Sequence, residues 1–158
     1  MYDADAPILA GIVLLISALV GLLATGILGG SILPHTPENI YLKTISIDGT
    51  PVKVEVADTP KERVQGLSGR ERMAENRGML FTFDEPGQYG IWMKDTLFPL
   101  DVYWADGDGV IIDMWEYARP ESYPTVYTPV KPASYVVEVV GGFSEVYNIE
   151  VGDQISGI

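Results

Sequence analysis

The sequence contains no cysteine and only one histidine, His35. Without cysteine the chain has no disulfides, no thiolate metal sites and no cysteine nucleophile. A zinc site is not expected from a single histidine. Ser68, Ser134 and Ser144 would lack a histidine base, because His35 lies in a proline-containing segment near the N-terminus. The sequence therefore predicts no metal and no cofactor, and it gives little support to nucleophilic catalysis.

Positive charge is also scarce. The chain has 10 Lys and Arg against 22 Asp and Glu, for a net charge of −12. Setting aside Asp3 and Asp5 leaves −10 on the remainder. Such a surface repels nucleic acid and anionic lipid headgroups. No nucleic-acid partner is predicted.

Charge is entirely missing from residues 6–34, and the strongly apolar part covers residues 8–28. As a helix with a rise of about 1.5 Å per residue, this part would be roughly 31 Å long, which matches the hydrocarbon thickness of a bilayer. A cleaved signal peptide is the alternative, but it needs a basic leader, and Met1–Asp5 contains no Lys or Arg. We therefore expect a retained transmembrane anchor.

The chain then divides into four parts. They are an acidic N-terminal tail (1–7), a transmembrane anchor (8–30), a short proline-containing spacer (31–39) and one β-rich domain (40–158). Lys43 is the one basic residue soon after the anchor, and by the positive-inside rule it favours, weakly, a cytoplasmic domain.

One face of the expected anchor helix carries only small side chains, spaced four residues apart: Ser17, Gly21, Thr25 and Gly29. Rows of this kind let two helices approach closely in lipid. They predict a transmembrane-helix partner, either a second copy or another subunit. Glycine is also common in membrane helices that have no partner, and that alternative stays open.

After the spacer, residues 40–47 and 51–56 alternate apolar and polar side chains around Asp48 and Gly49. This pattern predicts a β-hairpin with a tight turn. Thr59, followed by Pro60 and Glu62, predicts the start of a short helix, because the hydroxyl and the glutamate form a capping box.

Further strands are predicted at residues 79–83, 89–93, 98–105, 110–117 and 135–140. Short strands at this spacing indicate a mainly β fold with one short helix, arranged as a small sandwich or barrel. Asp106, Asp108 and Asp113 resemble a calcium loop only superficially, and a tight turn is the favoured interpretation. Residues 119–132 contain four prolines together with Tyr123 and Tyr127, and they predict an ordered loop that suits binding.

From Val54 onwards the chain resembles the family called domain of unknown function 192. The matching segments are VEVADTPKERVQGLSGRE, RGMLFTF, IWMKDTLFPLDVYWADGDGVI, ASYVVEVVGG and IEVGDQI. The resemblance covers residues 54–155 and implies a small mixed β fold with one short helix, often exported behind a signal or anchor. It therefore favours an extracytoplasmic domain, and we give it more weight than the positive-inside rule, which weakly favours a cytoplasmic one. Ile91 replaces an aromatic residue, Asp95 stands where asparagine is typical, and the loop cysteines of many members are absent.

Asp101 and Glu138 are single acids within apolar strands. A buried carboxylate needs a cationic or hydrogen-bonding partner. The first interpretation is structural: an arginine pairs with Asp101 or Glu138 and pins the short helix to the sheet. The second is functional: the two acids form an acid–base pair or a polar clamp in a pocket.

The tryptophans and tyrosines offer stacking surfaces, although most strand aromatics belong to the core, with Trp92 and Trp115 as the expected exceptions. The candidate binding residues are Arg63, Arg70, Trp92, Lys94, Thr96, Asp101, Glu138, Tyr123 and Tyr127. The leading hypothesis is a membrane-anchored extracytoplasmic module that binds a protein partner or small ligand without catalysis. The alternatives are a hydrolase of glycan or peptide that uses Asp101 and Glu138, and a structural subunit of a membrane complex.

Overall fold

The computed structural model describes residues 41–158. The predicted tail, anchor and spacer, with the row of Ser17, Gly21, Thr25 and Gly29, lie outside this range. No helix within the described part of the chain has the length and apolar character needed to cross a membrane. In chain order the elements are β1 (Leu42–Ile47), β2 (Thr50–Ala57), α2 (Pro60–Gln65), β3 (Arg77–Gly87), β4 (Ile91–Trp92), β5 (Leu100–Ala105), β6 (Ile111–Ala118), η1 (Pro120–Ser122), β7 (Val126–Tyr127), β8 (Ala133–Val140), α3 (Phe143–Tyr147) and β9 (Ile155–Ser156).

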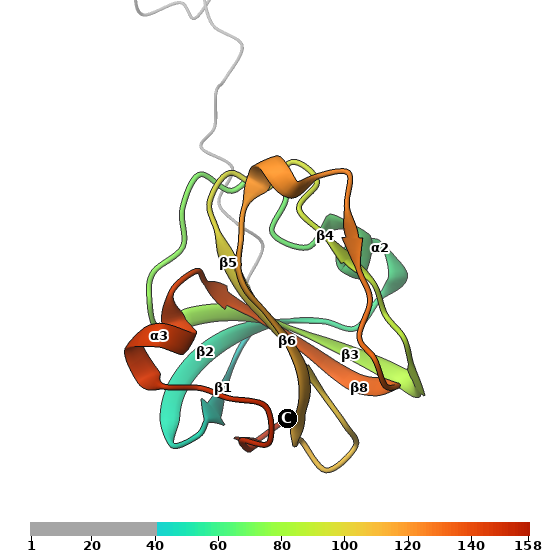
Figure 1. Cartoon of the computed structure of the whole chain (residues 1–158), viewed down its shortest axis with the longest axis vertical. Coiled ribbons are helices and arrows are strands. Elements are labelled where there is room, and N and C mark those ends of the chain that lie inside the picture. The colour runs from blue at the N-terminus through green and yellow to red at the C-terminus, as the bar shows by residue number, and fades with distance from the viewer. Residues whose placement is uncertain (1–40) are drawn as a thin grey trace, which may run out of the picture. The chain divides into compact units, whose positions relative to one another are not determined.

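Seven strands form one curled sheet in the order β6-β5-β8-β3-β2-β1-β9, and β4 and β7 form a separate two-stranded pair. Neighbouring strands of the large sheet are antiparallel, except that β2 and β3 are parallel. A parallel pair needs a crossover, and α2 lies in it. The sheet curls into a half-barrel (Figure 1). The mainly β prediction is therefore confirmed, whereas a sandwich of two packed sheets is wrong.

The local predictions near the start of the domain are confirmed. β1 and β2 form the hairpin, and Asp48 and Gly49 in its turn have φ angles of 42° and 82°. The Thr59 hydroxyl accepts the backbone N–H of Glu62, and the Glu62 carboxylate accepts the backbone N–H of Thr59. The second short helix, α3, was not predicted; it begins after Gly142, whose φ is 95°.

Both faces of the sheet are covered. One face carries an apolar core shared by β1, β2, β5, β8, α3 and β9, including Ile45, Val52, Tyr103 and Val137. The other face carries a second core that includes Phe81, Met93, Val102 and Trp104. Successive residues of β5 and β8 alternate between these two cores, because side chains along a strand point to opposite faces. This alternation decides which face each buried acid reaches.

Candidate functional site

A pocket of about 520 Å³ opens on the second face of the sheet. Its walls are α2 and the loop after it, the second half of β3, and the segment around β4. The residues that line it are Pro60, Arg63, Val64, Gln65, Gly66, Leu67, Ser68, Phe81, Phe83, Asp84, Glu85, Tyr89, Gly90, Ile91, Trp92, Thr96 and Glu138. Its volume falls within the range of roughly 300 to 1,000 Å³ that is typical of small-molecule sites.

Four aromatic side chains line the pocket: Phe81, Phe83, Tyr89 and Trp92. Phe81 and Phe83 lie two residues apart on β3 and therefore point to the same face. The Phe83 ring stacks on Tyr89, with centroids 3.4 Å apart. The backbone carbonyl of Tyr89 accepts the indole N–H of buried Trp104 at 2.8 Å, which fixes this wall to β5. Trp92 is 45% exposed and presents its ring at the opening.

Two short contacts join the other walls. The Ser68 hydroxyl donates to the Lys94 carbonyl at 2.8 Å, and the backbone N–H of Gly69 donates to the Asp95 carbonyl at 2.8 Å. Asp95 has a φ of 54°, a conformation that aspartate and asparagine adopt more readily than most residues. The loop after α2 and the segment before β5 are therefore held together on one side of the pocket.

Glu138 lies at the pocket floor. It sits on β8 opposite Met79 of β3 and Val102 of β5, and only 5% of it is exposed. Within residues 41–158 no side chain or backbone group makes a hydrogen bond to its carboxylate. Burial raises the pKa of Glu138 to about 8, and the positive charge of Arg70 opposes this rise. The site thus combines apolar walls with one acid that readily holds a proton.

Arg70 pairs with a different acid from those expected. Its guanidinium makes two hydrogen bonds to the Glu55 carboxylate, at 2.5 and 2.6 Å. Glu55 lies opposite Met79, so Glu55 and Glu138 flank Met79 on the same face of the sheet. The predicted pairing of an arginine with Asp101 or Glu138 is therefore wrong.

Hydrogen bonds from Arg63, rather than an ion pair, attach α2 to the sheet. Its Nη1 donates to the backbone carbonyls of Asp58, at 2.6 Å, and Thr82, at 2.9 Å. The guanidinium also lies over the Phe83 ring, 5.2 Å from its centroid. The sequence was right that an arginine pins the helix, and wrong about its partner.

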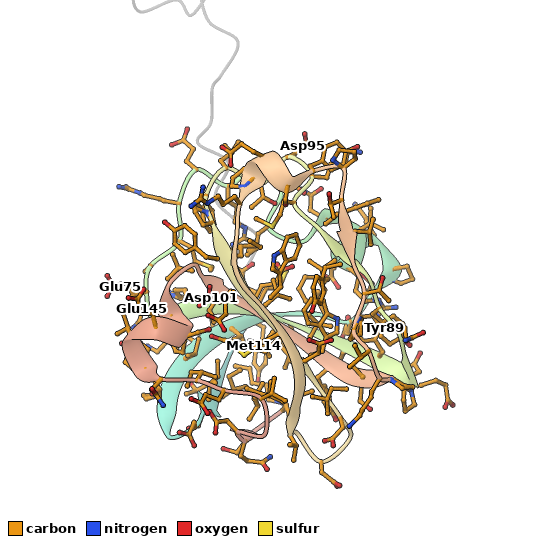
Figure 2. All side chains as sticks on the ribbon, in the orientation of Figure 1. Glu75, Tyr89, Asp95, Asp101, Met114 and Glu145 are labelled. Atoms are coloured by element: carbon orange, nitrogen blue, oxygen red, sulfur yellow. The ribbon has the colours of Figure 1, made fainter. Side chains whose placement is uncertain are left out.

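Asp101 lies on the opposite face of the sheet from Glu138, because Asp101 is paired with Val139 and the next residue, Val102, with Glu138. It is 1% exposed, and its carboxylate accepts the backbone N–H groups of Tyr117, Gly142 and Ser144 at 2.7–3.1 Å. Figure 2 shows Asp101 beside α3 and away from Tyr89 of the pocket. The structure does not form an Asp101–Glu138 acid–base pair, and it gives Asp101 the role of fixing the start of α3.

The structure brings together Arg63, Trp92, Thr96 and Glu138 of the predicted binding residues. Lys94 is exposed and does not line the pocket. In the loop at residues 119–132, the side chain of Tyr123 is exposed. The Tyr127 hydroxyl donates to Asp113 at 3.1 Å, and its ring stacks on Trp115, so Tyr127 belongs to the packing of the domain.

Sequence reasoning did not identify Phe81, Phe83 and Tyr89 as pocket walls, nor Glu55 as the partner of Arg70. Aromatic residues at every second position of a strand were the available signal for Phe81 and Phe83. Asp106 accepts the backbone N–H groups of Asp108 and Val110, as expected for a tight turn. Among residues 41–158, no cluster of three or more His, Asp or Glu side chains is arranged to hold a metal ion.

The fold and site define a small domain with one curled mixed β-sheet and an aromatic pocket over a buried acid. The chain belongs to the domain of unknown function 192 family, described as an uncharacterized ACR, whose profile matches residues 43–157. The resemblance seen in the sequence is thereby confirmed, and the match extends it to include the first hairpin.

The similar solved structures include the following two. A putative transcription regulator from Sinorhizobium meliloti 1021 is 32% identical, with a TM-score of 0.71, over 75% of this chain and 95% of that one. A protein of unknown function from Novosphingobium aromaticivorans DSM 12444 is 25% identical, with a TM-score of 0.71, over 77% of this chain and 89% of that one. A search of curated proteins gives no significant match.

Proposed function

We propose that this chain is a membrane-anchored extracytoplasmic module that binds a small ligand and has no catalytic activity of its own. The observation that carries the ligand-binding part is the pocket: about 520 Å³ of space, aromatic walls, and a buried carboxylate without a protein hydrogen-bond partner among residues 41–158. Large apolar pockets with a few convergent polar groups are the usual form of small-molecule sites.

The positions of Asp101 and Glu138 argue against catalysis. A glycosidase needs two carboxyl groups on opposite sides of the scissile bond, about 5 to 9.5 Å apart. Asp101 and Glu138 point to opposite faces of the sheet, and the Asp101 carboxylate is occupied by three backbone N–H groups. The hydrolase that we considered from the sequence is therefore not proposed.

Binding in the pocket is tested with the full chain in nonionic detergent and 2-phenylethanol as an uncharged aromatic probe. We expect the probe to shift the NMR signal of the Trp92 indole N–H, because Trp92 lines the pocket, and to leave the signal of Trp115 unchanged. Val64→Trp should weaken this binding, since Val64 lines the pocket and is 71% exposed.

Val146→Trp is the matched control, because Val146 is an equally exposed valine (72%) on the other short helix, α3, outside the pocket. Equal binding by both variants, or no response of Trp92 to the probe, would remove the proposed ligand site.

The membrane part of the proposal is supported by the uncharged, bilayer-length segment at residues 8–30 and by the exported members of the family that the chain resembles. Full-length chain should stay in the membrane pellet during alkaline carbonate extraction, and protease added to intact cells should digest the domain. Recovery in the soluble fraction, or protection from protease, would contradict it. Fixed stoichiometry with other membrane proteins after mild extraction would instead favour a structural subunit.

The description of one similar structure as a putative transcription regulator is not carried over to this chain. DNA binding draws most of its affinity from cationic side chains that contact phosphates. A net charge of −12 opposes such contacts.

A further inference from the structure

The polar groups of the pocket leave the Glu138 carboxyl group without a hydrogen-bond partner among residues 41–158. The Glu138 carboxylate opens into the pocket, and no group within the described residues donates a hydrogen bond to it. The hydroxyl of Thr96, which is 7% exposed and also lines the pocket, has no protein hydrogen-bond partner in the described range either. Among the described residues, no fully buried side-chain nitrogen or oxygen lacks a partner, so these unpartnered oxygen atoms are open to solvent in the pocket. A ligand that supplies a donor or a cation could therefore bind them directly.

The nearby cations already have partners. Arg70 is held by two hydrogen bonds to Glu55. Arg63 donates to two backbone carbonyls and lies over the Phe83 ring. Neither guanidinium forms a hydrogen bond with Glu138, although the charge of Arg70 lowers the pKa of Glu138. Within residues 41–158, Arg70 therefore acts on Glu138 through its charge alone, and a hydrogen-bonded counter-charge for ionised Glu138 would have to come from a ligand.

The remaining pocket residues also favour a cation. Asp84, Glu85 and Glu138 are three acids among the residues that line the pocket, and Arg63 is the single basic residue among them. A cation is also attracted to the faces of aromatic rings within about 6 Å. An anionic ligand would be repelled by these acids, and a neutral apolar ligand would gain nothing from ionised Glu138.

We infer that the pocket binds a small amine, whose ammonium group pairs with Glu138 and whose apolar body packs against Phe81, Phe83 and Trp92. This inference rests on the proposed function, because it assigns a ligand class to the same pocket. The amine has an apolar body of the size of an aromatic ring with a short chain, and Thr96 is placed to accept a second hydrogen bond from the ammonium.

Binding of an amine is coupled to the loss of a proton from Glu138. Without ligand, burial favours the protonated form of Glu138 below about pH 8, and the paired state needs the ionised form. Arg70 is the charged group that acts on Glu138, and its partner Glu55 lies on the same face of the sheet, on the other side of Met79. Arg63, Asp84 and Glu85 are the other charged residues that line the pocket. An aliphatic ammonium stays charged throughout this range, since such amines titrate near pH 10. Affinity should therefore fall by roughly ten-fold for each unit of pH below 8.

The test compares 2-phenylethylamine with 2-phenylethanol, its uncharged counterpart of the same shape. Binding to the full chain in nonionic detergent is measured by titration calorimetry in buffers of different ionisation enthalpy. We expect the amine to bind at least ten-fold more tightly at pH 8 and to release a proton when it binds at pH 7. Glu138→Gln should abolish the preference for the amine over 2-phenylethanol. Glu145→Gln, an exposed acid on α3, is the control and should keep the preference.

Equal affinity for the two probes in the wild-type chain, or a preference that survives in Glu138→Gln, would overturn the inference and leave the pocket as a site for neutral ligands. If neither probe shifts the Trp92 indole signal, both the inference and the proposed function fail. The comparison of the two probes on the wild-type chain does not depend on a variant, so it decides the question even if Glu138→Gln does not fold.

Discussion

Glu138 makes the stability of the domain depend on pH. Its pKa is raised from an ordinary value of 4.5 to about 8. Between these values the folded state keeps a proton that the unfolded chain has released, so the free energy of unfolding falls as pH rises, and the loss is complete above about pH 8. The full loss is on the order of 5 kcal/mol.

We therefore predict that Glu138→Gln removes most of this decline. Urea unfolding of both proteins over the range from about pH 5 to pH 9 measures it, with Glu145→Gln expected to follow the wild type. Parallel curves for the wild type and Glu138→Gln would show that the buried acid does not titrate in this range.

The role of Asp101 is to stabilise the fold rather than to take part in chemistry. Asp101→Ala removes an acceptor from the backbone N–H groups of Tyr117, Gly142 and Ser144. Hydrogen bonds to a charged group contribute about 1.5 to 3 kcal/mol each, so we expect a loss of about 3 kcal/mol or more in the free energy of unfolding. Asp101→Asn, which keeps one acceptor oxygen, should lose less. An unchanged urea midpoint in Asp101→Ala would contradict this role.

At the scale of elements, the loop between α2 and β3 affects the pKa of Glu138 in the pocket, because it carries Arg70. The charge of Arg70 lowers the pKa of Glu138 against the effect of burial. Arg70→Ala should raise that pKa further, because it removes a positive charge and leaves Glu55 without its partner. Carboxyl ¹³C NMR titration of Glu138 measures the change. Arg72→Ala, at an exposed position two residues further on, is the control; a lower pKa in Arg70→Ala would refute the coupling.

The elements that could be predicted from the sequence are those whose determinants lie close together in it. The Asp48-Gly49 turn and the Thr59–Glu62 capping box each depend on backbone geometry within four residues. The short helix α3 was missed because its start depends on Asp101, which lies more than 40 residues earlier in the chain.

The pocket was only partly predictable for the same reason. Alternation in β5 and β8 places Asp101 and Glu138 correctly within their strands, but the relative face of the two acids depends on the register between the strands. The register depends on contacts between strands that are far apart in the sequence, so no local pattern predicts it. Likewise, nothing in the sequence near Arg70 indicates that Glu55 would lie beside it.

At the scale of the whole described domain, the C-terminal segment connects the two edges of the curled sheet. β9 pairs with β1, and the adjacent Gln154 forms an isolated bridge with Val110, next to β6. Gly109 permits this contact: its φ is 83°, and a Cβ there would collide with the Ile155 carbonyl.

Gly109→Ala should therefore cost about 1 to 3 kcal/mol of unfolding free energy, because it combines backbone strain with a steric clash. Gly107→Ala in the same turn is the control, since its Cβ would make only an ordinary contact with Ser134 Oγ at 3.6 Å. Thermal unfolding compares the two variants, and equal melting temperatures would show that the edge contact contributes little.

The position of β8 in the sheet has a consequence for biosynthesis. β8 is the eighth strand in the chain, yet it lies between β3 and β5, so without it the sheet falls into two separate pieces. A nascent chain leaving the ribosome exposes the apolar faces of both pieces until residue 140 has emerged. The complete sheet therefore cannot form until β8 has been synthesised, and the apolar faces of the incomplete sheet are prone to aggregation during that interval.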